Sequence, residues 1–436
     1  MLNREVEKVD VIVIGGGTTG FGAAIAAARK GLKVTVLEAG EKIGGIMSDC
    51  PGMPFGGGFP TKKSIGGIFE ELIQRLFVME PPMAKRTVCS LEEFGDEVIY
   101  DHDAAIIEMY KMLDEAGVRI LLNSTALEPL INGNRIEGII YSNRSGINKI
   151  YGNFMIDCSG EGDISAKAGI PFEKGDIRGN MMGVTMTFIM RDADWKKIFD
   201  NNSDPYFTKY AEKGIKEGKI HKNLFKLYIM KAFHKDTVYF NSIHIPNVDG
   251  TNIDDIRRAE KEARKQCMEL AKFVKQEIPG FENSQMIYLG PTVGIRETRK
   301  FEGIYRITAE DIAQGNKFTD GIVCCDNPID DVMRGSNIMT HNHAVKEKGM
   351  YYRIPFRCFV PKKIENLLFA GKIISADPTA FASVRGMPQC ILMGQACGTA
   401  AGIALENRVT VQDIESETLI KDLENSGVKG LGEKII

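Results

Sequence analysis

The feature that most constrains the fold is a glycine cluster between a short apolar segment and an alanine-rich segment. Residues 9–14 (VDVIVI) are typical of a buried parallel strand, and FGAAIAAARKG (21–31) predicts a helix that stops at Gly31. Residues 33–40 (KVTVLEAG) predict a second strand. Strand, helix and strand together form a β–α–β unit of about thirty residues. The pattern therefore predicts an α/β fold with a parallel sheet.

The glycine cluster itself, Gly15-Gly16-Gly17-Thr18-Thr19-Gly20, matches the spacing GxGxxG. The first glycine permits a tight turn, the second lets the backbone approach a pyrophosphate, and the third lets the helix pack on the sheet. Glu38, at the end of the second strand, can accept hydrogen bonds from both ribose hydroxyls and would repel a 2′-phosphate. We therefore predict a dinucleotide site that disfavours NADP; a glycine-rich turn without a ligand is the alternative.

Length, charge and cysteine spacing bound the class of protein. A chain of 436 residues suggests two domains, or one large α/β domain with an insertion. A net charge of -3 argues against nucleic-acid binding. The sequence has no run of about 18 apolar residues, so no membrane span is expected. The first strand begins too early to leave room for a signal peptide. The nine cysteines fit no zinc spacing, which favours free thiols and a cytoplasmic location.

Two later segments decide which dinucleotide is expected. IDCSGEGD (156–163) and NLLFAGKIISADP (366–378) are typical of strands that end in small residues and acids. An NAD domain needs only the first β–α–β unit. A cofactor that also contacts the middle and the end of the chain is extended through the molecule, which favours FAD. Residues 191–285 are polar and lysine-rich, with a long helix predicted near 252–277. They are the best candidate for an inserted domain.

These motifs resemble those of flavoproteins with a glutathione-reductase-type FAD domain. The chain is most similar to the FAD-dependent oxidoreductases, a family distantly similar to fumarate reductase flavoproteins. The resemblance implies a Rossmann-like FAD-binding domain with three-layer ββα architecture plus an inserted α+β substrate or cap domain. The implied boundaries are 1–170 and 351–436 for the FAD-binding domain with its C-terminal helices, and 171–350 for the cap. The similar segments are GGGTTGFGAAIAAA, VLEAGEKIGG, IDCSGEGDISAKAG, GIRETRKFEGIYRITAEDI, YRIPFRCFVP, NLLFAGKIISA and SVRGMPQCILMGQACGTAA.

The same resemblance implies which residues contact FAD. Pro388 suits the first turn of a helix over 388–405, whose partly positive N-terminus would face flavin N1 and O2. A tightly packed core helix with a surface arginine is the alternative. The implied cofactor-binding residues are Gly15, Gly17, Thr18, Thr19, Gly20, Glu38, Ala39, Gly44, Gly45, Ile46, Met47, Ala126, Cys158, Ser159, Gly160, Gly371, Lys372, Arg385, Gly386 and Met387.

Cys50 follows the double glycine at 44–45, where disulfide reductases of this superfamily carry two cysteines. The next cysteine is Cys89, and a thiol–disulfide relay needs a resolving thiol. Disulfide reduction is therefore disfavoured, and Cys50 is expected to be an inert packing residue or a substrate contact. The following loop, PGMPFGGGFP (51–60), is predicted to be a wall or lid of the site, or else an irregular connector.

Hydride transfer needs a proton-transferring group, and carboxylate or carbonyl substrates favour an arginine or histidine clamp. GIRETRKFEG (294–303) predicts strand and turn, so only one of Arg296 and Arg299 should face the site. His341 and His343 are two residues apart and could bind a metal from one strand face. Two histidines without a carboxylate partner are weak evidence, so no metal is predicted. The wider candidates include Arg334, His341, Tyr351, Tyr352 and Arg353, each with a structural alternative. YRIPFRCFV (352–360) predicts a strand of alternating character, in which Arg357 faces the flavin or else forms a salt bridge. The predicted catalytic residues are Arg357, Arg296, Arg385, His343 and Cys50.

The predicted activity is that of an FAD-dependent oxidoreductase that transfers hydride between flavin N5 and a small or medium organic substrate. No second GxGxxG occurs, so electrons would pass to or from the substrate, a docking nicotinamide, or an external protein or quinone. Two alternatives remain: a flavin subunit of an electron-transfer complex, and a methyl-transfer flavoprotein of the tRNA-modifying type. The sequence leaves substrate identity, reaction direction and oligomeric state open.

Overall fold

The structure, a computed structural model, describes residues 7–89, 94–200, 202–334, 339–342 and 350–432. Its main body is built on a seven-stranded sheet in the order β6-β2-β1-β9-β8-β7, with β20 also pairing with β9. β1, β2, β6, β9 and β20 are parallel neighbours, whereas β7, β8 and β9 form an antiparallel meander. The predicted α/β fold is confirmed. The strands are β1 (Glu7–Ile14), β2 (Val34–Leu37), β6 (Arg119–Leu121), β7 (Thr125–Asn132), β8 (Arg135–Asn143), β9 (Gly146–Asp157) and β20 (Leu367–Phe369).

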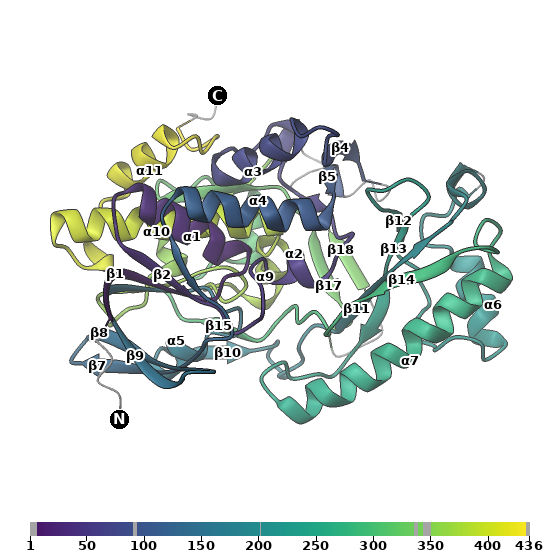
Figure 1. The fold of residues 1–436 in the computed structure, drawn as a ribbon, viewed down its shortest axis with the longest axis horizontal. Coiled ribbons are helices and arrows are strands. Elements are labelled where there is room, and N and C mark those ends of the chain that lie inside the picture. Colours follow the sequence, from purple (N-terminus) through teal and green to yellow (C-terminus); the bar gives the residue numbers. More distant parts are fainter. Residues whose placement is uncertain (1–6, 90–93, 201, 335–338, 343–349, 433–436) are drawn as a thin grey trace.

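Both faces of the main sheet are covered, because successive side chains of β1 point to opposite faces. Val11 and Val13 join a large core cluster with helices α1 (Thr18–Arg29) and α10 (Met387–Asn407). Ile12 and Ile14 join a second cluster with the meander. In Figure 1, α1 and α10 lie together above the sheet. This two-sided burial explains why residues 11–14 of β1 are all apolar.

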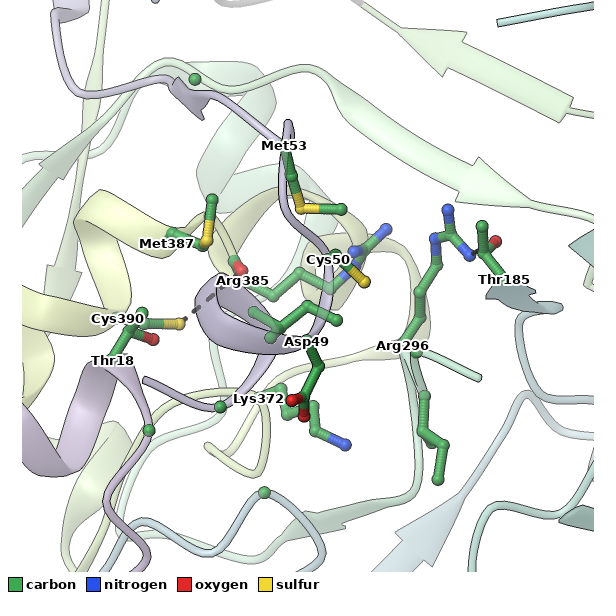
Figure 2. Close-up of a pocket in the computed structure, with 18 of the residues that line it drawn as sticks. Thr18, Asp49, Cys50, Met53, Thr185, Arg296, Lys372, Arg385, Met387 and Cys390 are labelled. Atoms are coloured by element: carbon green, nitrogen blue, oxygen red, sulfur yellow. Dashed lines mark hydrogen bonds between the residues drawn. The ribbon is translucent and has the colours of Figure 1, made fainter. Parts of the chain in front are cut away.

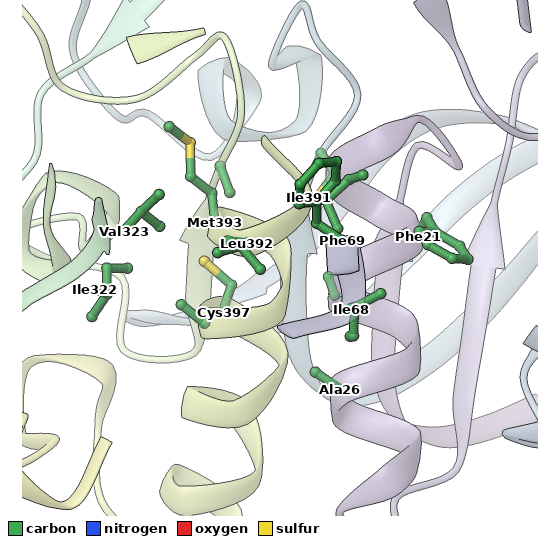
Figure 3. Packing of buried hydrophobic residues seen from close by; sticks show 14 of the residues in the cluster. Phe21, Ala26, Ile68, Phe69, Ile322, Val323, Ile391, Leu392, Met393 and Cys397 are labelled. Atoms are coloured by element: carbon green, nitrogen blue, oxygen red, sulfur yellow. The ribbon is translucent and has the colours of Figure 1, made fainter. Parts of the chain in front are cut away.

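The contact between α1 and α10 depends on glycine. A Cβ on Gly22 would lie 2.1 Å from the Ile391 carbonyl oxygen, and one on Gly394 would lie 1.9 Å from the Thr19 carbonyl oxygen. The two backbones therefore touch directly, which accounts for the small residues of the predicted helix 388–405. Figure 3 shows Ile391 and its neighbours on α10 packed between α1 and the helix that carries Phe69.

Further helices and small sheets complete the main body. Asp101 caps α4 by accepting a hydrogen bond from the backbone N–H of Ala104 at 2.7 Å. The additional elements are α2 (Ile46–Asp49), β3 (Phe55–Gly56), α3 (Gly67–Phe77), β4 (Ala84–Val88), β5 (Asp96–Tyr100), α4 (His102–Glu115), α5 (Asp163–Lys167), α8 (Ala309–Gln314), β16 (Gly321–Cys325), β19 (Tyr352–Pro355), α9 (Pro378–Val384) and α11 (Ser416–Asn425).

A four-stranded antiparallel sheet, β12-β13-β11-β14, lies at the other end of the molecule and is called the cap sheet below. Val184, Met186, Phe188 and Met190 on β11 point into a separate core beneath the long helix α7. The alternate residues of the strand point to the opposite face. Asn252 caps α7, so the helix predicted near 252–277 is confirmed. The elements are β11 (Val184–Arg191), α6 (Thr208–Lys216), β12 (Ile229–Lys231), β13 (Val238–Ile245), α7 (Ile253–Glu277) and β14 (Gln285–Leu289).

Two short antiparallel strand pairs complete the described structure. β10 (Phe172–Lys174) pairs with β15 (Arg299–Phe301), and β17 (Ile329–Val332) pairs with β18 (Met339–Asn342). The predicted domain boundaries at 170 and 350 stay a prediction. The strand expected through YRIPFRCFV is wrong beyond Pro355, because residues 356–359 turn into a 3-10 helix. Within the described ranges, every helix is too short or too polar to cross a bilayer.

Candidate active site

A cavity of about 540 Å³ lies between the glycine loop, the N-terminus of α10 and the cap sheet. Its volume falls in the usual range of small-molecule and cofactor pockets. In Figure 2, Thr18 and Cys390 lie on one side of the cavity, Arg296 and Thr185 lie on the other, and Arg385 lies between them. The main body and the cap sheet thus enclose one space.

The glycine loop presents bare backbone to this cavity. Gly15 has a φ of +94°, and a Cβ there would lie 2.5 Å from the Cys158 carbonyl oxygen; one on Gly20 would lie 1.8 Å from the Gly15 carbonyl oxygen. These two glycines serve backbone packing. A Cβ on Gly17 would meet no atom closer than 3.8 Å, and α1 begins there without a side-chain cap. The loop therefore leaves room and free N–H groups for a pyrophosphate.

Glu38 lies beside the glycine loop, at the C-terminal end of β2. Its Oε2 accepts a hydrogen bond from the Gly16 N–H, and its Oε1 accepts one from the Gly40 N–H, both at 2.6 Å. These bonds fix the carboxylate at the edge of the cavity. Each oxygen keeps a further lone pair, which suits the hydroxyls of an adenosine ribose.

The opposite wall begins at the N-terminus of α10. Gly386 starts this helix without a side-chain cap, and the helix runs for 21 residues, so its exposed N–H groups carry a partial positive charge. Arg385 donates to the Asp330 carboxylate at 3.2 Å and to the Asp330 carbonyl oxygen at 3.1 Å. Its buried Nε has no hydrogen-bond partner among the described residues. Uncapped N–H groups and an unpartnered guanidinium N–H fit the electron-rich edge of a flavin.

Most of the predicted cofactor residues line the cavity, although their contacts with FAD stay a prediction. Gly20, Ala39, Gly44, Met47, Ala126 and Gly371 do not line it. Met47 is buried in the main core, and Ala126 packs on the other face of the sheet. The residues that line it are Gly15, Gly17, Thr18, Thr19, Glu38, Gly45, Ile46, Cys158, Ser159, Gly160, Lys372, Arg385, Gly386 and Met387.

The predicted catalytic residues separate into two groups. Arg296, Arg385 and Cys50 line the cavity. Arg357 does not: its side chain is 44% exposed and pairs with Asp320 at 2.9 Å, so its assignment to the active site is corrected here to an ion pair outside the cavity. His343 lies outside the described residues.

The wider candidates are mostly structural. As expected, only one of the two arginines of GIRETR faces the cavity, because Arg299 donates to Asp163 and to the Glu161 carbonyl oxygen instead. Arg334 is buried beside Glu297 and Asp331. The Tyr352 hydroxyl is buried and lies 2.7 Å from Ser383 Oγ. None of these three side chains lines the cavity.

Cys50 has the properties of a packing residue. It is 2% exposed, and burial raises the pKa of its thiol to about 11. The thiol is therefore protonated at neutral pH and is a poor nucleophile. Met53, Pro54 and Gly56 of the following loop also line the cavity, so the loop forms part of its wall.

Sequence reasoning missed the polar side chains that the cap sheet contributes. Their signal was the alternation of polar and apolar residues in β11, where Thr185 and Thr187 face away from the cap core. Such a pattern marks one face of a strand, but it does not say what that face meets. The missed cavity residues of the cap sheet are Thr185, Thr187, Tyr239, Asn241 and His244. The missed cavity residues outside the cap sheet are Glu97, Asn327, Asp330, Ser383 and Cys390.

The fold and cavity define a flavin-binding α/β enzyme. The model of the FAD dependent oxidoreductase family matches residues 10–424, and the chain belongs to that family. Its cofactor is FAD, and it is a flavin-dependent oxidoreductase.

A curated relative is digeranylgeranylglycerophospholipid reductase from Methanothrix thermoacetophila, 30% identical over 184 residues. That match covers 39% of this chain and 44% of the relative, so it spans less than half of the relative's length.

Two solved structures show the fold. The p-nitrophenol 4-monooxygenase of Pseudomonas putida has a TM-score of 0.50 at 11% identity, covering 96% of this chain and 84% of that chain. The myxobacterial chondrochloren halogenase has a TM-score of 0.51 at 10% identity, covering 96% and 78%.

Proposed function

We propose that the enzyme transfers hydride between N5 of FAD and a small or medium organic substrate held against the cap sheet. The observation that carries the proposal is the shared cavity: its lining includes the glycine loop, the start of α10, and side chains of β11 and β13. When bound, FAD supplies the hydride acceptor or donor. The residues of this chain hold the two reactants in one enclosed space.

The main body binds the cofactor, and the cap side binds the substrate. The bare loop at Gly17 and the carboxylate of Glu38 hold the adenosine and pyrophosphate part. The N-terminus of α10 and Arg385 would lie beside the flavin ring and would favour negative charge on its pyrimidine edge. The wall formed by residues 50–56 limits water access on the cap side.

A hydride transfer also needs a group that exchanges a proton with the substrate. Glu97 lines the cavity and is 7% exposed, and burial raises the pKa of its carboxyl group to about 7. A group that titrates near neutral pH is suited to general acid–base catalysis. We assign this role to Glu97.

The test is to record the visible spectrum of the purified protein and then add a panel of reduced organic substrates without oxygen. Bound FAD should give a flavin spectrum, and a substrate should bleach it. A colourless protein that takes up no FAD on reconstitution would overturn the proposal.

A matched pair of glycine variants controls this experiment. Gly17→Val should abolish FAD binding, because the added side chain would occupy the space left for the pyrophosphate while meeting no close protein atom. Gly16→Ala places a Cβ against Glu38 Oε2 at 3.2 Å rather than in open space, and should weaken FAD binding less. Equal FAD binding by Gly17→Val and the parent would contradict the assignment of the loop.

A further inference from the structure

Arg296 is a cavity-lining arginine with no ion pair among the described residues. One of its Nη atoms donates to the Gly183 carbonyl oxygen at 3.0 Å and to the Thr185 hydroxyl, both uncharged. Burial and the nearby positive charge of Arg385 lower the pKa of Arg296 to about 10, which still leaves it charged at neutral pH. The protein thus places a cation against the cavity without pairing it directly with a carboxylate of the described residues.

The carboxylates that line the cavity are already engaged elsewhere. Asp330 pairs with Arg385 at 3.2 Å, Asp49 with Lys42 at 3.7 Å, and Glu161 with Lys372 at 2.9 Å. Glu38 accepts from two backbone N–H groups. Glu97, the remaining one, has a raised pKa and makes no ion pair in the described part of the chain. Asp330 raises the pKa of Arg296 through its charge, but its carboxylate is paired with Arg385. Among the described residues, no cavity carboxylate forms an ion pair with Arg296 itself.

The neighbours of Arg296 on the cap sheet present hydrogen-bond donors. Thr185 Oγ1 accepts from Arg296, and we assign its own proton to His244 Nδ1, 2.7 Å away. Burial lowers the pKa of His244 well below its ordinary value, and the neutral ring then carries its hydrogen on Nε2. That Nε2 and the Tyr239 hydroxyl are both buried and have no partner among the described residues.

A half-buried cation and two buried, unpartnered donors of the neighbouring cap sheet define the chemistry of a ligand. Buried polar groups are costly when they stay unpaired, so the site is built for an acceptor that arrives with the substrate. A planar carboxylate is such an acceptor, because it binds guanidinium through two parallel hydrogen bonds. Tyr228, Met230 and Phe94 line the same cavity and offer apolar surface to the remainder of the molecule.

We propose that Arg296, with Tyr239 and His244, binds the carboxylate of an organic acid that has an apolar body, and that this acid is the substrate of the hydride transfer. The inference rests on the proposed function and names its substrate class. Figure 2 shows Arg296 across the cavity from Thr18, at the start of α1. The carboxylate would thus be held on the side away from the pyrophosphate loop.

The test is to titrate the FAD-loaded enzyme with benzoate and with benzamide, its neutral analogue, and to follow the flavin absorption spectrum. Benzoate should bind about 10- to 100-fold more tightly than benzamide. Arg296→Met should remove most of this preference, Arg296→Lys should restore part of it, and Tyr239→Phe should weaken benzoate binding less. Arg357→Ala, which removes an arginine outside the cavity, is the matched control and should bind both probes like the parent.

Three results would overturn the inference. One is that benzoate binds no better than benzamide, or not at all. Another is that Arg296→Met binds benzoate like the parent. The third is that Arg296→Met loses FAD while benzoate still binds to the FAD-free protein. That result would show that the charge of Arg296 serves FAD binding rather than substrate binding.

The proposed function fails in a different way, when the parent protein takes up no FAD. Thermal shift of the FAD-free protein with the same two probes still measures the carboxylate preference in that case. Melting curves of each variant, recorded without probe, show whether a lost preference comes from misfolding.

Discussion

The side chain of Arg334 is buried and that of Arg296 is half-buried at the cavity, and their surroundings differ in a second respect. Arg334 donates to Glu297 at 2.5 Å and to Asp331 at 3.0 Å. Arg296 donates only to uncharged oxygens. The first arginine forms ion pairs with two carboxylates, whereas the second forms no ion pair in the described ranges and receives only the longer-range charge of Asp330.

The difference separates a structural arginine from a ligand-binding one. A buried charge that finds its partners in the fold stabilises that fold only as a complete group, because removal of one member leaves the others unpaired. A buried charge without a partner gains nothing from folding and is retained for something that binds later. The comparison predicts opposite consequences for mutations at the two sites.

The largest effect is expected at the centre of the Arg334 group. Glu297 is fully buried and also accepts from Lys300 Nζ at 2.5 Å and from the Met182 N–H at 3.0 Å. Glu297→Gln leaves buried Lys300 without its paired carboxylate and Arg334 with Asp331 alone, and should cost about 3–5 kcal/mol of unfolding free energy. Chemical denaturation measures this loss.

Glu302→Gln is the matched control for that measurement. Glu302 pairs with Lys362, and both side chains are about half exposed. A surface pair of this kind contributes no more than about 1 kcal/mol. If the two variants lose similar amounts of unfolding free energy, the buried ion-pair group of Glu297 is no more important for stability than an exposed pair.

The second effect concerns Glu97, a buried acid without a cation. Unlike arginine, a carboxyl group responds to such a site by keeping its proton, and burial raises its pKa from 4.5 to about 7. The folded state therefore binds a proton that the unfolded state releases above pH 4.5. This stabilisation is fully present below that pH and is lost as the pH rises to about 7, by about 2–3 kcal/mol.

Glu97→Gln should flatten this dependence, because the amide does not titrate. Unfolding free energies of the parent and the variant, measured between pH 4.5 and 8, give the comparison. A parent whose stability relative to the variant is constant across this range would show that Glu97 is ionised in the folded state. The same variant should lose the corresponding ionisation in the pH profile of turnover.

The sequence predicted the glycine loop, the long helices and the parallel strands, because each is encoded by local spacing. It also predicted that one arginine of GIRETR would face the site. It could not distinguish Arg296 from Arg334, since the answer depends on Glu297 and Asp331, which reach Arg334 through the tertiary fold. Tyr239 and His244 were missed because nothing in an isolated strand shows which sheet face meets a cavity.

Arg357 shows the same limit from the other direction. Its segment was predicted as a strand, with Arg357 facing the flavin or forming a salt bridge. The chain instead turns after Pro355, and the guanidinium pairs with Asp320 and lies over the ring of Tyr305. Arg357→Ala should therefore cost about 1 kcal/mol of stability, discounted for its exposure. Turnover of the FAD-loaded enzyme should stay within about twofold of the parent, and a loss of a hundredfold would return Arg357 to the active site.

The smallest effect on stability is expected at Arg296 itself. Arg296→Met keeps an unbranched side chain of similar length while removing a charge that burial and Arg385 both disfavour. Removal of this unfavourable charge offsets the loss of the hydrogen bonds to Gly183 and Thr185. The unfolding free energy should therefore change by less than about 1 kcal/mol, in either direction. Thermal and chemical unfolding of the ligand-free protein measure it. A loss as large as that of Glu297→Gln would mean that Arg296 is compensated after all, and the contrast between the two arginines would then no longer identify a ligand site.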